Sequence, residues 1–265
     1  MVPDVLETSG GTWEVLDKVK HTNYFSVHDF SLTNVFQLPP HLRRVYRRND
    51  SNKTEYIAKH VRSGSNELAI HDYLRTKPYQ SPHIISLIKS IPSTTREWLI
   101  LPKLSSIRNQ LYMKRGGVAD RVRLGWGLVK GLAYLHEHKI AHRDIKPDNL
   151  VGDRHFILKI IDFDLAIKVR DENTEIVEYC GTQGWTAPEI GGQDGPAAMY
   201  SPIKADRWSC GRVLLHHIMV GMARTGDHRL LNFANELMAK DPQQRPSLLD
   251  GESMQPPDAK RPRLE

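Results

Sequence analysis

The sequence has few of the features that mark secreted, membrane-spanning or repetitive proteins. Cys180 and Cys210 are its only cysteines, which excludes a disulfide scaffold and favours a reducing compartment. No apolar run approaches the ~18–20 residues that a membrane span needs, and no segment repeats at a solenoid period. The start, MVPDVLETSGG, has acidic residues and no apolar centre, so we expect no signal peptide. The expected location is therefore the cytosol, with the nucleus as the alternative.

Charge and composition exclude further classes. The 37 Lys and Arg exceed the 31 Asp and Glu by a net charge of +6, which does not by itself indicate nucleic acid. Hydrophobic residues make up 39% of the 265 residues, so the composition is not that of a disordered chain. This length suits one large or two small domains. Residues 251–265 are polar and contain three basic residues, and we expect a flexible, solvated basic tail there rather than a nuclear-import patch.

The first half of the chain favours strands. Residues 43–50 and 54–61 have strand composition and flank a polar turn, which predicts a β-hairpin. A helix is predicted over 65–76, where Ser65 is a candidate N-cap. Residues 97–104 form a short apolar run that contains a proline, typical of a buried strand leading into a linker.

The second half favours helices. In residues 118–140 leucines recur at spacings of four, four and three, which places them on one face of a long helix. Three glycines in this segment each weaken a helix by about 1 kcal/mol relative to Ala, so the helix must depend on packing. Residues 156–163 are predicted as strand, and 206–220 and 229–240 as two more helices. Strands followed by helices predict an α+β fold with two lobes.

A compact polar loop, HRDIKPDN at residues 142–149, follows the long predicted helix. Asp162 comes after the next apolar run, and GTQGWTAPE follows at 181–189. In this order the motifs resemble a eukaryotic protein kinase of the Ser/Thr type, over about residues 43–246. The resemblance implies a bilobal α+β fold with a small strand-rich N-lobe and a mainly helical C-lobe.

The resemblance also implies a division of the chain. We expect an N-terminal extension over 1–28, an N-lobe with its hinge over 29–104, a C-lobe over 105–250 and the flexible basic tail over 251–265. No motif indicates oligomerisation, so the expected state is a monomer.

The resemblance assigns the transfer chemistry to the polar loop and to Asp162. Phosphoryl transfer requires positioning and charge stabilisation more than covalent chemistry. Asp144 would accept or orient the substrate hydroxyl, and Lys146 would steady the transferred phosphoryl group. Asn149 and Asp162 would hold Mg²⁺ against the phosphates of ATP. Asp144 and Asn149 could each be a turn former, but that role does not explain the whole set at these spacings.

Four further residues are implied in ATP binding. Lys59 resembles the strand lysine that contacts the α- and β-phosphates, and Glu67 would pair with it from the following helix. The alternative for these two is an ordinary surface ion pair. Leu101 would close the back of the adenine pocket, and the Leu104 N–H would donate to the adenine ring. A plain core strand followed by a turn is the alternative for both leucines.

The resemblance also implies residues that support the loop. Thr182 would hydrogen-bond toward the catalytic loop, as in Ser/Thr kinases. Glu189 would pair with Arg245, and Asp206 would hold the backbone of the loop.

Arg143 resembles the arginine that receives an activation-segment phosphate. Thr174 or Tyr179 would be the phosphate acceptor, or Glu175 or Glu178 would substitute for the phosphate. An exposed acidic loop is an equal alternative.

The sequence departs from the family pattern in two places. The family has a glycine-rich phosphate loop ahead of the strand lysine, whereas residues 31–48 contain no glycine. Glycines let backbone N–H groups approach phosphates closely, so ATP binding could be weakened. Asp164 stands where the family has Gly after Asp162 and Phe163, a pattern that resembles a variant among fungal kinase-like proteins. Asp tolerates left-handed backbone better than most residues but less well than Gly.

Two main hypotheses follow. The first is a protein Ser/Thr kinase that uses ATP and Mg²⁺ on a protein hydroxyl, with an upstream kinase as a further partner and with neither nucleic acid nor membrane. The second is a pseudokinase that acts as a binding or scaffolding module, motivated by the missing glycines and Asp164. A small-molecule kinase is a third reading, and residues 181–189 argue against it because this segment shapes a peptide groove in protein kinases.

Overall fold

The chain folds into two compact units. The structure is a computed structural model that describes residues 5–8, 11–15, 41–47, 54–92, 96–113, 117–192, 195, 198–222 and 227–254. The sheet unit comprises Met1–Leu68 and Ser86–Lys103, and the helical unit comprises Ala69–Ile85 and Leu104–Glu265.

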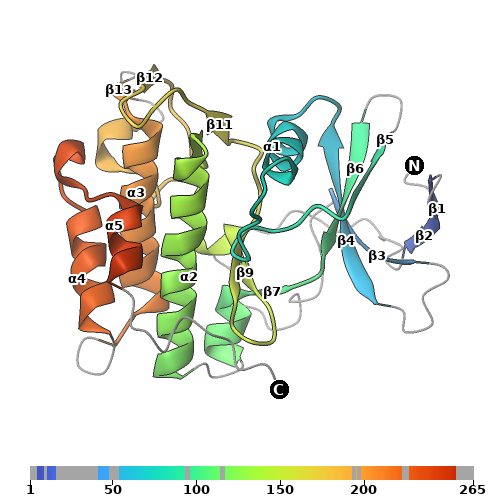
Figure 1. The fold of residues 1–265 in the computed structure, drawn as a ribbon, viewed down its shortest axis with the longest axis horizontal. Coiled ribbons are helices and arrows are strands. Elements are labelled where there is room, and N and C mark those ends of the chain that lie inside the picture. The colour runs from blue at the N-terminus through green and yellow to red at the C-terminus, as the bar shows by residue number, and fades with distance from the viewer. Residues whose placement is uncertain are drawn as a thin grey trace. The chain divides into compact units, whose positions relative to one another are not determined.

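The sheet unit is built on a six-stranded antiparallel sheet with the order β1-β2-β3-β4-β6-β5 (Figure 1). Its strands are β1 (Val5–Thr8), β2 (Gly11–Val15), β3 (Leu42–Arg47), β4 (Glu55–Arg62), β5 (Lys89–Pro92) and β6 (Arg96–Pro102). The predicted hairpin is confirmed, because β3 pairs with β4 and places Val45 opposite Tyr56. Its turn lies outside the described residues.

One face of this sheet forms a core. Partners opposite each other in an antiparallel pair point to the same face. Ala58 is opposite Ile100 and Ile91 is opposite Trp98, and all four are buried together with Val45. Lys59, the next residue after Ala58, therefore points to the other face. The predicted strand over 97–104 is confirmed as β6, an interior strand between β4 and β5 whose apolar run is buried.

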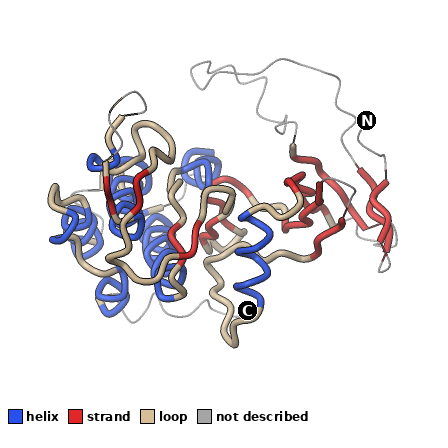
Figure 2. The backbone as a smooth tube through the Cα atoms, turned by 90° about the horizontal axis from the view of Figure 1, so that it is seen from above, coloured by secondary structure: helices blue, strands red, loops and turns tan. Residues whose placement is uncertain are grey.

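The helical unit has one long helix and several shorter ones. Its helices are α2 (Val118–Glu137), α3 (Pro202–Val213), α4 (His228–Leu237) and α5 (Leu248–Ser253), with the later part of α1 (Asn66–Arg75). Short strands form three small sheets: β10 (Leu158–Ile160), β9 (Leu150–Gly152) and β7 (Ser105–Ser106); β11 (Ile167–Lys168) and β8 (Ile140–Ala141); β12 (Ile176–Val177) and β13 (Met199–Tyr200). Tight 3-10 turns occur at Pro147–Asn149, Pro188–Ile190 and Pro242–Gln244, and π turns at Asn109–Met113 and Leu214–Ile218. The α2 helix packs mainly against α5, and α3 packs mainly against α4. Figure 2 shows the helices in blue, gathered in this unit.

The α2 helix forms the core of this unit, as its leucine spacing predicts. Leu124, Leu128, Leu132 and Leu135 are fully buried. The glycines of α2 allow close approach of its neighbours. A Cβ atom on Gly131 would lie 3.0 Å from the His83 carbonyl oxygen and from Ile160 Cδ1, and one on Gly125 would lie 2.6 Å from Leu230. Packing therefore accounts for residues that helix propensity alone disfavours.

The predicted boundaries differ from the structure at three places. Residues 5–8 and 11–15 are sheet strands rather than an N-terminal extension, because β2 pairs with β3. Residues 69–85, expected in the N-lobe, belong to the helical unit, where the Ile85 N–H donates to the Ile160 carbonyl at 3.1 Å. The predicted tail begins too early, because α5 continues to Ser253 and buries Gly251 against the Phe233 ring.

The remaining helix predictions are confirmed with small shifts. The segment 206–220 is α3 followed by a π turn, and 229–240 is α4. The Ser201 Oγ caps α3 by accepting from the Lys204 N–H, and Pro202 occupies its first position. Among the described helices, none combines the length and the apolar character needed to cross a membrane.

Candidate active site

The polar loop 142–149 begins directly after the buried strand β8 and is held by Asp206. The Asp206 carboxylate, from α3, accepts from the His142 N–H at 2.6 Å and from the Arg143 N–H at 2.8 Å. His136 Nε2 lies 3.2 Å from the same carboxylate. Arg143 has a left-handed φ of 68°, a strained conformation that these bonds help to hold. The contact expected from Asp206 is thus present.

Asp144 lies at the centre of a bonded cluster of side chains. The Thr182 hydroxyl donates to Asp144 Oδ1 at 2.7 Å, and Lys146 Nζ donates to the Thr182 Oγ1 at 2.7 Å. Lys146 Nζ also lies 2.8 Å from Asp144 Oδ2. Asn149 Nδ2 donates to Asp144 Oδ2 at 2.9 Å and to the Asp144 carbonyl oxygen at 2.8 Å. Three predicted residues and Thr182 therefore meet at one carboxylate.

Asn149 and Asp162 offer oxygen atoms that suit a divalent cation. Because both Asn149 Nδ2 bonds go to Asp144, the Asn149 Oδ1 remains as a ligand atom. The Ile161 N–H donates to the Asn149 carbonyl at 3.0 Å. Asp162 is the next residue, so its backbone lies close to that of Asn149. Carboxylate and amide oxygens are the ligands that hard divalent cations prefer. The donor set therefore fits the expected metal, and the assignment of these ligands stays a prediction.

The backbone around Asp162 explains why Asp164 is compatible with the fold. Asp162 has a left-handed φ of 68°, whereas Asp164 is not among the residues with positive φ. The Phe163 side chain is fully buried, with its ring centroid 5.4 Å from the ring of His142 and 5.2 Å from that of His71. The residue that replaces the family glycine therefore needs no left-handed conformation here.

In the sheet unit, Lys59 of β4 forms a buried ion pair with Glu67. The two side chains are 7% and 0% exposed, and Lys59 Nζ contacts Glu67 Oε2. Glu67 lies in the first turn of α1, where the helix dipole favours an acidic side chain. The alternative of a surface ion pair is therefore wrong. A role for this pair in ATP binding stays a prediction.

The two hinge leucines lie at and just after the end of β6. Leu101 is buried and pairs with Ile57 of β4. Leu104 follows the strand, and its N–H has no acceptor among the described residues. A free donor at this position is what the predicted bond to adenine requires. Both assignments stay predictions.

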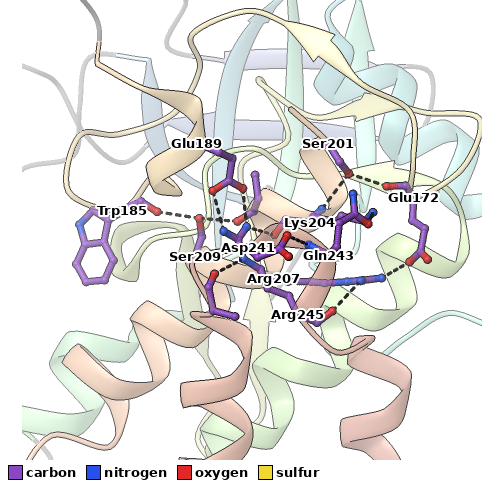
Figure 3. A network of polar contacts seen from close by, with 12 residues as sticks. Glu172, Trp185, Glu189, Ser201, Lys204, Arg207, Ser209, Asp241, Gln243 and Arg245 are labelled. Atoms are coloured by element: carbon purple, nitrogen blue, oxygen red, sulfur yellow. Dashed lines mark hydrogen bonds and ion pairs between the residues drawn. The ribbon is translucent and has the colours of Figure 1, made fainter. Parts of the chain in front are cut away.

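A buried polar network that the sequence analysis missed lies beside the Glu189–Arg245 pair (Figure 3). The Arg245 guanidinium donates to both Glu189 carboxylate oxygens, at 2.5 and 2.7 Å, as expected. Arg207 and Lys204 of α3 belong to the same network although both are charged, and both are buried. The α3 segment carries four charged residues, Lys204, Asp206, Arg207 and Arg212, and the first three are buried, a set that the helix sequence alone does not single out.

The comparison with known families settles what this arrangement belongs to. A model of the protein kinase domain matches residues 45–223. The chain belongs to the protein kinase domain family. This membership confirms the predicted bilobal α+β fold class, and it implies the use of ATP and a divalent metal ion, and protein substrates.

Several protein kinases are similar to this chain. The carbon catabolite-derepressing protein kinase of Saccharomyces cerevisiae is 32% identical over 160 residues, which are 60% of this chain and 24% of that protein. Sucrose non-fermenting protein kinase 1 of Fusarium virguliforme is 32% identical over 152 residues, 56% of this chain and 21% of that protein. CBL-interacting serine/threonine-protein kinase 7 of Arabidopsis thaliana is 30% identical over 166 residues, 60% of this chain and 37% of that protein. This kinase domain chain thus spans between 21% and 37% of the length of these relatives.

Proposed function

We propose that this chain is an ATP-dependent protein serine/threonine kinase. It transfers the γ-phosphoryl group of ATP to a Ser or Thr hydroxyl of a protein substrate. The observation that carries the proposal is the cluster in which Lys146, Asn149 and Thr182 all bond to Asp144. The relatives are named as protein kinases, one of them as a serine/threonine-protein kinase, and these names support the same reaction.

Asp144 is the group that receives the substrate hydroxyl. The Thr182 bond fixes one carboxylate oxygen, and the Asn149 bond fixes the other, so the carboxylate has one set orientation. In the reaction the hydroxyl oxygen bonds to the γ-phosphorus, its proton goes to Asp144, and ADP leaves with the bridging oxygen. Lys146 supplies positive charge 2.8 Å from the Asp144 carboxylate, where the transferred phosphoryl group would pass.

The metal that we propose is Mg²⁺, held by the Asn149 amide oxygen and the Asp162 carboxylate. When bound, this ion would neutralise charge on the phosphates. The chain's own contribution is to orient the Asn149 amide through its bonds to Asp144 and to tie the backbone just before Asp162 to the Asn149 carbonyl. Lys59, held by Glu67, would contact the α- and β-phosphates.

A pure binding module would not need this arrangement of side chains. A scaffold gains nothing from a carboxylate that has Thr182 on one oxygen and both Asn149 and the Lys146 ammonium group at the other. The glycine-free stretch that motivated the pseudokinase alternative lies mainly outside the described residues, and Asp164 fits the backbone without strain. We therefore favour the enzyme.

The test is phosphoryl transfer from γ-labelled ATP to a mixed panel of Ser and Thr protein substrates, with Mg²⁺ or Mn²⁺. Replacing Asp144→Asn should reduce transfer by roughly 10²–10⁴-fold, since it removes the proton acceptor but keeps the shape. Asp250→Asn, at an exposed position of α5, is the matched control and should transfer as the wild type does. Equal transfer by wild type and Asp144→Asn, or none by the folded wild type with either metal, would overturn the proposal.

Location in the cytosol or nucleus stays a prediction. A fluorescent fusion of the full chain tests it, and accumulation at a membrane or in the secretory pathway would contradict it.

A further inference from the structure

Two acid–arginine pairs hold one segment of the helical unit, residues 171–180, which follows β11. Glu172 pairs with Arg207 of α3, and Glu178 pairs with Arg143 of the catalytic loop through a 2.5 Å bond from Nη2 to Oε2. In both pairs the arginine side chain is 6% exposed, and the glutamates are 51% and 60% exposed. The buried partner belongs to the rest of the unit, and the exposed partner belongs to the segment.

Each arginine depends on the segment for its charge compensation. Among the described residues, Glu178 is the only carboxylate in an ion pair with Arg143, and Glu172 is the only one in an ion pair with Arg207. The Nε atoms of both arginines are buried without a hydrogen-bond partner. A buried guanidinium is unfavourable unless it is paired. The unit is therefore most stable when the segment lies where both glutamates reach their arginines.

The Glu172–Arg207 pair is connected by hydrogen bonds to the Glu189–Arg245 pair, as Figure 3 shows. Arg207 Nη1 donates to the Arg245 carbonyl at 3.3 Å, and Arg245 binds Glu189 at the end of the GTQGWTAPE stretch. Ser201 Oγ donates to the Glu172 carbonyl at 2.6 Å. The start of the segment is thus tied to α3, the helix whose Asp206 holds the catalytic loop.

Lys204 adds a second tie at the same place. Its Nζ donates to Asn173 Oδ1 at 2.8 Å and to Gln243 Oε1 at 2.5 Å. Arg207 also lowers the pKa of the Glu172 carboxyl by its hydrogen bond, so the acid stays ionised at neutral pH.

The second pair acts next to the catalytic aspartate. Arg143 immediately precedes Asp144 and has a left-handed φ of 68°. A bond that fixes the Arg143 side chain therefore also restrains the turn that presents Asp144. Glu178 already occupies the guanidinium that the family resemblance reserves for a phosphate.

The two candidate phosphate acceptors of the segment make contacts elsewhere. Thr174 Oγ1 donates to Asp171 Oδ1 at 3.2 Å and accepts from the Asp171 N–H at 3.1 Å, within a local turn. Tyr179 packs against the apolar cluster that includes Ala187, Ile190 and Trp208. Among the residues that the structure describes, neither Thr174 nor Tyr179 is hydrogen-bonded to Arg143.

We propose that Glu172 and Glu178 hold segment 171–180 in its working conformation through Arg207 and Arg143, so that catalysis needs no phosphate on this segment. The proposal rests on the proposed kinase activity. A phosphate group carries a charge of about −1.5 to −2 at neutral pH, which is more than the single charge of a carboxylate. The glutamate charge, however, is always present and needs no modifying enzyme. Of the four residues considered for this role, the structure assigns it to Glu178, and it adds Glu172, which the sequence pattern did not single out.

The first experiment uses the full chain after treatment with a protein phosphatase, with mass spectrometry to verify that the segment carries no phosphate. We expect the dephosphorylated wild type to retain its transfer rate. Thr174→Ala and Tyr179→Phe should retain it as well. Loss of transfer on dephosphorylation, regained when Thr174 or Tyr179 is phosphorylated, would overturn the proposal.

The second experiment removes each charge without changing shape. Glu172→Gln and Glu178→Gln should each lower kcat by about 10-fold or more, because each removes a hydrogen bond between charged groups. The KM for ATP should change little, and Glu178→Asp should restore part of kcat. Glu175→Gln is the matched control, since Glu175 is an exposed acid of the same segment with no ion pair among the described residues. Glutamine variants that behave like Glu175→Gln would overturn the proposal.

Limited proteolysis separates this proposal from the proposed function, because it needs no kinase activity. Glu172→Gln and Glu178→Gln should be cleaved faster within 171–180 than the wild type and Glu175→Gln, as detected by mass spectrometry. If Glu172→Gln fails to fold, the double variant Glu172→Gln with Arg207→Met removes the uncompensated charge and should show the same fast cleavage. An inactive wild type with this cleavage pattern would remove the kinase proposal alone. Unchanged cleavage in all variants would remove the two pairs as the hold on the segment.

Discussion

The Glu189–Arg245 pair gives the sharpest stability prediction, for the substitution Glu189→Gln. The Arg245 side chain is fully buried, and Glu189 is 17% exposed. Arg245 binds both carboxylate oxygens of Glu189, and it also donates from Nε to the Ala239 carbonyl at 3.0 Å and from Nη1 to the Lys204 carbonyl at 2.9 Å. The guanidinium is thus held by one charged acceptor and two neutral ones.

The expected loss of stability follows from that bonding. Removing one partner of a buried ion pair costs about 3–5 kcal/mol, since the other charge stays buried without compensation. The carbonyls remain as acceptors and Glu189 lies near water, so we expect the lower end, about 3 kcal/mol. A loss of this size lowers Tm by roughly 6–12 °C for a chain of this length.

The assay is thermal unfolding of the full chain, together with urea denaturation. Asp72→Asn is the control, because it removes the carboxylate from an exposed Arg75–Asp72 pair and should cost no more than about 1 kcal/mol. The double variant Glu189→Leu with Arg245→Met should cost less than the two single variants added together. A loss below about 1 kcal/mol for Glu189→Gln, or a double variant that equals the sum, would refute the reasoning.

Three further predictions concern packing, pH and the site. Gly131→Ala should lower Tm despite a helix propensity gain of about 1 kcal/mol, because its Cβ would lie 3.0 Å from the His83 carbonyl and from Ile160, and a thermal scan tests this. Burial lowers the pKa of His83 to about 4, so the unfolded state binds more protons between about pH 6.5 and 4 and stability falls as the pH falls. His83→Gln should reduce this slope by up to ~1.4 kcal/mol per pH unit, measured by denaturation across that range. Thr182→Val should lower kcat by about 10-fold, since it frees the Asp144 carboxylate, whereas Thr182→Ser should retain activity in the transfer assay.

The sequence predicts the elements that have a strong hydrophobic pattern, and it predicts the catalytic loop at residues 142–149. The leucines of α2 recur at helical spacing because they share one buried face, and the strand composition of β4 and the apolar run of β6 belong to two paired interior strands of a sheet. Asp144, Lys146 and Asn149 lie within six residues, so a single short loop brings them together. Such features depend on neighbours along the chain, which a sequence displays directly.

Elements that depend on distant partners could not be predicted in the same way. The short strands β1 and β2 have weak patterns of their own, and they are strands because β3 pairs with β2. The sequence around Gly251 is polar and predicts a tail, but in the structure Gly251 packs against the ring of Phe233, which is distant in sequence. The boundary at residues 69–85 depends likewise on backbone pairing with Ile160.

The α3 helix shows why buried charges escape a sequence pattern. A polar residue in a helix normally indicates a solvent-facing position. In α3, however, Lys204, Asp206 and Arg207 are all buried, because each meets a partner that lies far away in the chain. Asp206 holds the catalytic loop, Arg207 holds the start of segment 171–180, and Lys204 holds its next residue.

This placement gives one helix control over several parts of the site. Ser209 of α3 also donates to the Trp185 carbonyl at 2.8 Å, within the GTQGWTAPE stretch (Figure 3). The α3 helix therefore contacts the catalytic loop, the start of segment 171–180 and the GTQGWTAPE stretch that follows it. A site supported from one helix keeps its geometry better than one built on independent loops. The charges of α3 are thus explained by the positions that they impose on other segments, which is information that the helix's own sequence does not contain.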